Sequence, residues 1–139
     1  MKVVIINSGS SSIKYQLIDM PENAVICSGM IDRIGLETSN LSYVTDSIKM
    51  QETLPTANRK IEVEKIAPML MDDKVGVIKS TSEIQAVGHR VVHGGSSFTK
   101  TVVITEEVKE KIRQLFDLAP LHNPANLEGI NVAEEIFNT

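Results

Sequence analysis

The chain has 139 residues, 42% of them hydrophobic, and a formal net charge of -4 at pH 7. This length and composition predict one globular domain that removes about two thirds of its unfolded surface from water. The negative charge argues against a nucleic-acid-binding protein, so any anion site has to be a local one. No segment approaches the roughly 20 apolar residues of a membrane span. Cys27 is the only cysteine, which excludes an internal disulfide and favours a reducing, cytoplasmic location.

The amino-terminal residues predict a buried strand that leads into a polar turn. Residues 3–6 are Val-Val-Ile-Ile, a β-branched run without a polar face, and such runs are typical of strands buried on both sides. Residues 7–12 are small and polar, and residues 13–17 alternate as a returning strand. The two strands together predict a hairpin whose tip is rich in hydrogen-bond donors.

This hairpin tip has the residue types needed to hold a phosphate group. Gly9 lets the backbone approach a ligand closely, and the three serines at positions 10–12 add hydroxyl groups. Lys14 shares a strand face with Ser12, so its ammonium group can reach back over the tip. The same residues are also ordinary turn chemistry beside a solvated lysine, and their spacing alone does not decide between the two interpretations.

The middle of the chain predicts further strands and one helix. The expected strands are one antiparallel neighbour at residues 24–31 and two edge strands at residues 41–44 and 48–54. Asn58 is expected to cap a helix that Pro68 kinks or ends, because proline has no backbone donor. The buried side of this helix is expected to be Ile61, Ile66 and Met69 or Leu70. Residues 76–83 are expected to form a loop with a short strand or turn.

A second informative stretch, Ala-Val-Gly-His-Arg-Val-Val-His-Gly-Gly at residues 86–95, predicts a buried strand that ends at a loop. Alternation places Gly88, Arg90 and Val92 on one face of this strand. An arginine is costly to bury unless it meets an anion, so this face predicts a pocket for a small carboxylate or a phosphoryl group. The alternative is a structural arginine that pairs with a carboxylate of the same domain.

His89 and His93 have the spacing of a metal-binding pair, but only if they lie on a helix. On a strand the same spacing separates the two side chains by about 13 Å, which is too far for one zinc ion with bonds near 2 Å. A zinc site is therefore excluded for this pair.

The last third of the chain predicts two helices. Thr105 is expected to cap the first, with Glu106 and Glu107 in its first turn, where negative charge opposes the helix dipole. Its apolar stripe is expected to be Val108, Ile112, Leu115 and Phe116, and Pro120 is expected to end it.

The second of these helices is expected to have Asn123 as its cap and Pro124 at its first position. Its buried side is expected to be Leu127, Ile130, Ala133, Ile136 and Phe137. His122 then lies just before a helix amino terminus, where the dipole favours anions. A histidine that only bonds a nearby backbone group is the alternative interpretation.

Three motifs resemble stretches of the acetate kinase family, the carboxylate kinases of the actin and sugar-kinase superfamily. They are Asn-Ser-Gly-Ser-Ser-Ser-Ile-Lys at 7–14, Val-Gly-His-Arg-Val-Val-His-Gly-Gly at 87–95 and Ala-Pro-Leu-His-Asn-Pro at 119–124. The resemblance implies an α/β, ribonuclease-H-like (actin-like ATPase) domain. Its mixed sheet is expected to open with antiparallel strands and to be flanked by helices.

The resemblance also implies a reaction, in which the family moves the γ-phosphoryl group of ATP to acetate, reversibly and with Mg²⁺, to give acetyl phosphate. By this resemblance Arg90 is the catalytic residue that binds the carboxylate or the phosphoryl group in flight, and Val92 and Leu121 line the acyl pocket. The residues that the resemblance places at the phosphates are Asn7, Ser10, Ser12, Lys14 and His122, with Asn7 also near the metal.

The resemblance covers only the opening part of a longer family of two-domain enzymes, which commonly dimerise. Residues 1–139 are therefore expected to be an N-terminal domain that is inactive without the C-terminal domain and its adenosine site. A propionate or butyrate kinase fits the same motifs. A non-catalytic phosphate-binding module of the same fold is an alternative of a different class.

Overall fold

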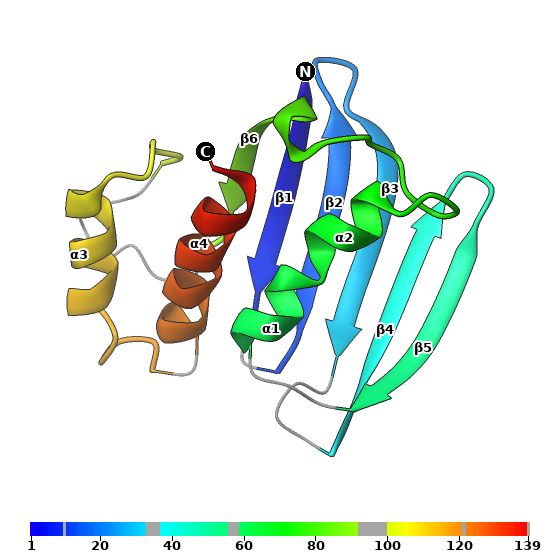
Figure 1. The fold of residues 1–139 in the computed structure, drawn as a ribbon. Coiled ribbons are helices and arrows are strands. Elements are labelled where there is room, and N and C mark those ends of the chain that lie inside the picture. The colour runs from blue at the N-terminus through cyan, green and yellow to red at the C-terminus, as the bar shows by residue number, and fades with distance from the viewer. Residues whose placement is uncertain (10, 33–36, 56–58, 92–99, 121, 139) are drawn as a thin grey trace.

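In the described part of the chain, a mixed sheet forms one layer of the protein and helices cover one of its faces (Figure 1). The computed structural model describes residues 1–9, 11–32, 37–55, 59–91, 100–120 and 122–138. The strands are β1 (Lys2–Ser8), β2 (Ile13–Asp19), β3 (Ala24–Asp32), β4 (Thr38–Thr45), β5 (Lys49–Pro55) and β6 (Ile84–His89). Their order in the sheet is β5-β4-β3-β2-β1-β6, where β1 and β6 are parallel and the other neighbours are antiparallel. The predicted α/β class and the antiparallel opening strands are confirmed.

Helices α1 (Arg59–Glu64), α2 (Ile66–Met71) and α4 (Asn123–Phe137) lie on one face of this sheet (Figure 1). Val4 and Ile6 of β1 face these helices and are fully buried, whereas Ile5 points to the other face and is 38% exposed. The prediction that β1 is buried on both sides is therefore wrong within the described residues. We call the uncovered side the open face of the sheet.

The helix that was expected to kink or end at Pro68 is divided earlier, at Lys65, into α1 and α2, and its expected cap Asn58 lies outside the described residues. Pro68 has no N–H group with which to bond the carbonyl of Glu64, four residues earlier, so a continuous helix would lose a hydrogen bond there. The buried side of the pair is Val63, Ile66, Ala67 and Leu70. Ile61, which was expected on this side, is 44% exposed, so that part of the prediction is wrong.

Helix α3 (Glu106–Gln114) packs on α4 rather than on the sheet, through a small cluster of Ile112, Leu127 and Ile130. The backbone N–H of Val108 donates to Thr105 Oγ1 at 3.3 Å, which confirms the predicted cap. Helix α4 begins one position earlier than expected, so its cap residue is His122 instead of Asn123.

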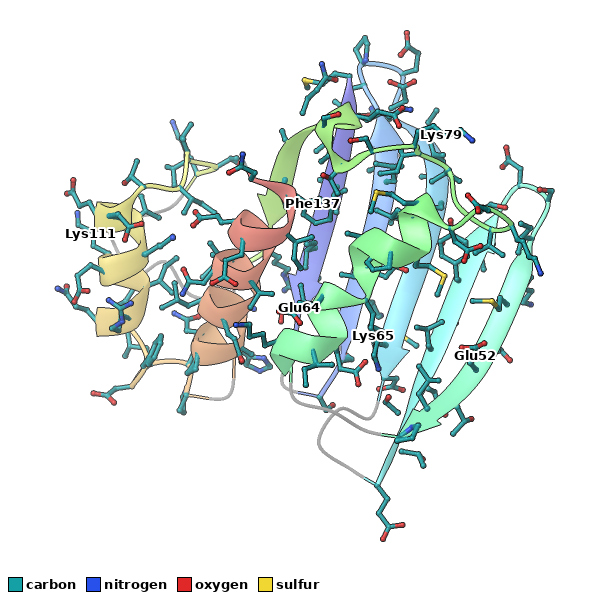
Figure 2. All side chains as sticks on the ribbon, viewed as in Figure 1. Glu52, Glu64, Lys65, Lys79, Lys111 and Phe137 are labelled. Atoms are coloured by element: carbon teal, nitrogen blue, oxygen red, sulfur yellow. The ribbon has the colours of Figure 1, made fainter. Side chains whose placement is uncertain are left out.

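The main core lies between the sheet, α1, α2 and α4, and Figure 2 shows its side chains, with Phe137 at the carboxyl end of α4. Tyr43 is fully buried, and its hydroxyl donates to the Val75 carbonyl at 2.9 Å. The predicted loop at 76–83 contains one short 3-10 helix, η1 (Thr81–Glu83), which leads into β6. No helix among the described residues is long and apolar enough to cross a membrane.

Candidate functional site

Three of the predicted site residues lie in a row across β2, β1 and the end of β6. Asn7 of β1 pairs with Lys14 of β2. On the other side Ile6 pairs with His89, and the backbone N–H of Arg90 donates to the Ile6 carbonyl at 3.2 Å. Neighbouring strands are about 4.8 Å apart, and directly opposed residues project to the same face. The row therefore brings Lys14, Asn7 and Arg90 together at the carboxyl end of β1.

This row faces the open side of the sheet. Gly88 pairs with Ile5, and a Cβ atom at Gly88 would lie 2.9 Å from Ile5 Cδ1, so both positions belong to the open face. Arg90 is two residues further along and continues the pairing, so alternation places it on the same face. The face that was predicted for Gly88 and Arg90 is thus the side without helices, while Val92 lies outside the described residues.

The two cations of the row, Lys14 and Arg90, are exposed, and neither has an ion-pair partner among the described residues. The expectation of a buried Arg90 inside a strand at 86–95 is wrong, because β6 ends at His89 and Arg90 follows it in solvent. The alternative of a buried arginine paired with a carboxylate of this domain is excluded by the same exposure.

The residues of the row line different hollows in the part of the chain that the structure describes. Asn7 and Lys14 line a hollow of about 450 Å³ on the open face, with Ile5 and Val44 among its apolar walls. Arg90 instead lines a hollow of about 860 Å³ between β6, residues 100–104, α3 and α4. Asn7 and Lys14 therefore border one hollow, and Arg90 borders the other.

The tip of the hairpin is closed by a hydrogen bond from the Gly9 N–H to the Ser12 carbonyl at 2.8 Å. A Cβ atom at Gly9 would meet Ser12 at the ordinary contact distance of 3.5 Å, so Ser12 leaves room for a side chain there. The predicted role of Gly9, close approach to a ligand, stays a prediction. Ser12 is half-buried, and Ser10 lies outside the described residues.

Helix α4 begins at the end of the sheet where β1 finishes (Figure 1). The Asn126 carboxamide donates from Nδ2 to the Ser8 carbonyl at 2.6 Å. A Cβ atom at Gly129 would lie 2.8 Å from Ser8 Cβ, so helix and strand approach closely. This docking places the exposed His122, at the cap of α4, on the same side of the molecule as the hairpin tip, while Leu121 is outside the described residues.

Asn126 was missed by the sequence reasoning, although a signal for it exists. Asn123 and Asn126 are one turn apart on the buried side of α4, where the neighbouring buried residues are apolar. Two asparagines inside an apolar stripe indicate a polar partner, because a buried amide without one is costly.

His89 lies on the helix-covered side of β6 and lines the larger hollow with Glu134. Burial lowers the pKa of its imidazole to about 4, against the opposing attraction of Glu134, so the side chain is neutral at pH 7. His93, its partner in the rejected zinc pair, lies outside the described residues. Among the described residues no group of three or more His, Cys, Asp or Glu side chains could hold a metal ion.

Comparison with known sequences decides the family, since residues 2–139 match the Acetokinase family. The chain belongs to this family. It is 69% identical over 137 residues to an acetate kinase of Flavobacterium johnsoniae, a match that covers 99% of this chain and 35% of that protein. The predicted family resemblance is confirmed.

Solved structures give the same result for the fold. The crystal structure of an acetate kinase from Porphyromonas gingivalis matches with a TM-score of 0.89 at 44% identity, over 97% of this chain and 34% of that one. A propionate kinase from Francisella tularensis matches with a TM-score of 0.87 at 34% identity, over 99% of this chain and 34% of that one. The fold is the actin-like ATPase fold of the acetokinases. The chain spans about a third of the length of these relatives.

Proposed function

We propose that this chain forms the phosphate- and acyl-binding part of an acetate kinase, an enzyme that transfers the γ-phosphoryl group of ATP to acetate. The observation that carries the proposal is the row of Lys14, Asn7 and Arg90, in which two exposed cations flank an amide at the end of β1. Uncommitted cations beside a donor-rich turn favour a ligand with several anionic oxygens.

In the proposed reaction the residues act mainly by positioning and by neutralising charge, because phosphoryl transfer needs little covalent help from the protein. Arg90 would hold two oxygens of the acetate carboxylate or of the moving phosphoryl group in its planar fork. Lys14 and Ser12 would lie along the phosphates, together with Ser10 and His122. Val92 and Leu121 would limit the size of the acyl pocket.

We expect Mg²⁺ to bind this part of the chain only as a complex with the nucleotide. Mg²⁺ is usually bound by one or two carboxylates together with phosphate oxygens and water. The row offers one neutral oxygen, from Asn7, and the described residues hold no group of three acidic, histidine or cysteine ligands. Asn7 would therefore contribute a ligand to an ion that ATP brings, and the ion would lower the charge repulsion during transfer.

The length of the relatives supports the proposed domain organisation. The chain matches 34–35% of the length of an acetate kinase from each of two organisms and of one propionate kinase. We assign residues 1–139 to the N-terminal domain of a two-domain, cytoplasmic enzyme that assembles as a homodimer. The adenosine site and the remaining catalytic groups would come from a C-terminal domain.

A second candidate function is a kinase for propionate or butyrate. The TM-scores for the acetate kinase and the propionate kinase differ only from 0.89 to 0.87, so the fold of this part does not separate the two substrates. One added methylene in an apolar pocket changes binding by about 1–3 kcal/mol, which makes the wall at Val92 and Leu121 the place where they would differ. A non-catalytic phosphate-binding module is the remaining alternative.

The test measures acyl phosphate formation by two proteins. One is the chain of 139 residues, and the other is a chimera in which this chain replaces the matching part of the Flavobacterium johnsoniae acetate kinase. We expect the chain alone to be folded and silent, because only one side of the transferring group is represented. We expect the chimera to prefer acetate over propionate and butyrate. An inactive but folded chimera would favour the non-catalytic module, and acetate-dependent ATP turnover by the chain alone would refute the proposed division of labour.

A further inference from the structure

We propose that Asn126 is a positioning residue of the kinase site, and that its bond to the Ser8 carbonyl sets the distance between the phosphate-binding hairpin and the start of α4. This inference rests on the proposed function and adds a residue to it. Asn126 would touch neither substrate nor nucleotide. It would act through the backbone of β1.

The bond itself is short and enclosed. Asn126 Nδ2 lies 2.6 Å from the Ser8 carbonyl oxygen, and the two residues are 118 positions apart in the sequence. Each residue is 2% exposed. Water cannot easily enter at this depth, so removal of the donor deprives the buried Ser8 carbonyl of this hydrogen bond.

A second contact, on the next turn of α4, fixes the same junction. Gly129 approaches Ser8 so closely that a Cβ atom there would lie 2.8 Å from Ser8 Cβ and 3.1 Å from Ser8 Oγ. A side chain at this position would force helix and strand apart. The hydrogen bond and the glycine therefore hold one residue of β1 from two successive turns of the helix, which limits sliding along the helix axis as well as separation.

The junction affects the proposed site because Ser8 directly precedes the hairpin tip. Ser8 is the last residue of β1 and directly precedes Gly9, whose N–H closes the hairpin tip on Ser12. At the other side of the junction, α4 starts at Asn123 and has His122 as its cap. The hairpin tip and the start of α4, both of which carry residues proposed for the phosphates, are thus joined by this hydrogen bond. An error of about 1 Å in such an arrangement can cost as much as 100-fold in rate.

The test compares Asn126→Ala with two control variants in the chimera with the Flavobacterium johnsoniae acetate kinase. Asn131→Ala makes the same chemical change on α4 at a residue without a side-chain hydrogen bond to any described residue. Ile130→Val weakens the packing of α3 on α4 and leaves Ser8 untouched. We expect Asn126→Ala to lower kcat/KM about tenfold or more, with a raised KM for ATP, and both controls to stay within about twofold.

The outcomes separate this inference from the proposed function. If the unaltered chimera makes no acyl phosphate, the proposed function fails. If the chimera is active and Asn126→Ala only lowers the melting temperature, while kcat and KM of the folded protein match those of Ile130→Val, Asn126 is structural and the inference is wrong. Unchanged stability and kinetics would overturn it as well.

A measurement on the unaltered chain covers the case in which Asn126→Ala does not fold. Titration with pyrophosphate, followed by NMR, should shift the backbone amide signals of Gly9 and Ser12. The side-chain amide signal of Asn126 should shift in the same titration, because the hairpin and the carboxamide move together. A hairpin that responds while the Asn126 signal stays in place would overturn the coupling.

Discussion

The two ends of strand β1 use charge in opposite ways. At the beginning of the strand, the amino-terminal ammonium group of Met1 pairs with Asp19 at 3.1 Å, and Lys2 pairs with Glu83 at 2.9 Å. At the other end, Lys14 and Arg90 have no acidic partner among the described residues. The first end holds β1, β2 and η1 together, whereas the second end leaves its positive charge available. The comparison separates the end of β1 where charged groups stabilise the fold from the end where we expect them to bind a ligand.

The largest effect should come from Arg90, at the uncommitted end. Lysine keeps the charge but lacks the planar fork that binds two oxygens, so Arg90→Lys in the chimera should lose about 100-fold or more in kcat/KM for acetate. The melting temperature should hardly change, because Arg90 is exposed and has no ion-pair partner among the described residues. Thermal stability and steady-state kinetics, measured on the same preparation, test both parts. Normal acetate kinetics in Arg90→Lys would remove Arg90 from the site.

The next effect is on stability and concerns His89, which lies at the same end of the sheet on its helix-covered face. Its pKa is about 4 in the folded protein and 6.5 in an unperturbed histidine, because burial disfavours the charged imidazolium. The neutral form therefore contributes stability above pH 6.5, and this contribution is lost as the pH falls to 4. We expect a loss of about 2–3 kcal/mol in the free energy of unfolding across this window.

Urea unfolding at several pH values measures this loss for the unaltered chain and two variants. His89→Gln should flatten the curve between pH 6.5 and 4. His122→Gln makes the same chemical change at an exposed histidine and is the matched control for the substitution itself. An unchanged curve in His89→Gln would show that His89 does not titrate as its burial implies.

Glu83, at the paired end, should give a smaller and separate response to acid. Its pKa falls from 4.5 to about 2, chiefly because Lys2 donates to its carboxylate and the backbone N–H groups of Lys79 and Ser80 do so as well. The ionised form contributes stability above pH 4.5, which is lost as the pH falls towards 2. Glu83→Gln should remove this second acid step and leave the His89 step in place. A single acid step that Glu83→Gln leaves unaltered would contradict the assignment.

The smallest effect on stability is expected for Lys14. Its side chain is exposed and has no ion-pair partner among the described residues, so Lys14→Ala should shift the melting temperature by no more than about 2 °C. Pyrophosphate binding, followed by NMR or calorimetry, should weaken clearly in the same variant. Lys2→Ala is the control at the paired end, where stability should change and pyrophosphate binding should not. Unfolding of Lys14→Ala would make Lys14 a structural residue.

Local patterns predicted most of the strands and helices of this fold. The alternation at 13–17 and the cap at Thr105 are properties of neighbouring residues, and both were recovered. The exposure of Ile5 was not, because it depends on which face the distant helices cover. The break at Lys65 was expected only as a kink or an end at Pro68 and falls three residues earlier.

The candidate site was predictable only in part, for the same reason. The motifs named Asn7, Lys14 and Arg90, but their common row depends on the parallel pairing of β1 with β6, which no local pattern encodes. Asn126 was missed because its partner is a backbone carbonyl that any residue type would supply at position 8. Sequence reasoning is weakest where a side chain bonds a distant backbone group.

The order of the strands also has a consequence for how the protein is made. Strands β1 to β5 pair in the order in which they are synthesised, so their contacts are local and can form early. The pairing of Lys2 with Ile84 and the bond from Asn126 to Ser8 have to wait until much more of the chain has left the ribosome. We therefore expect the hairpin to exist well before the site does. In pulse-labelling hydrogen exchange, amide groups of β2 and β3 should gain protection ahead of those of β6, and simultaneous protection would contradict this order of assembly.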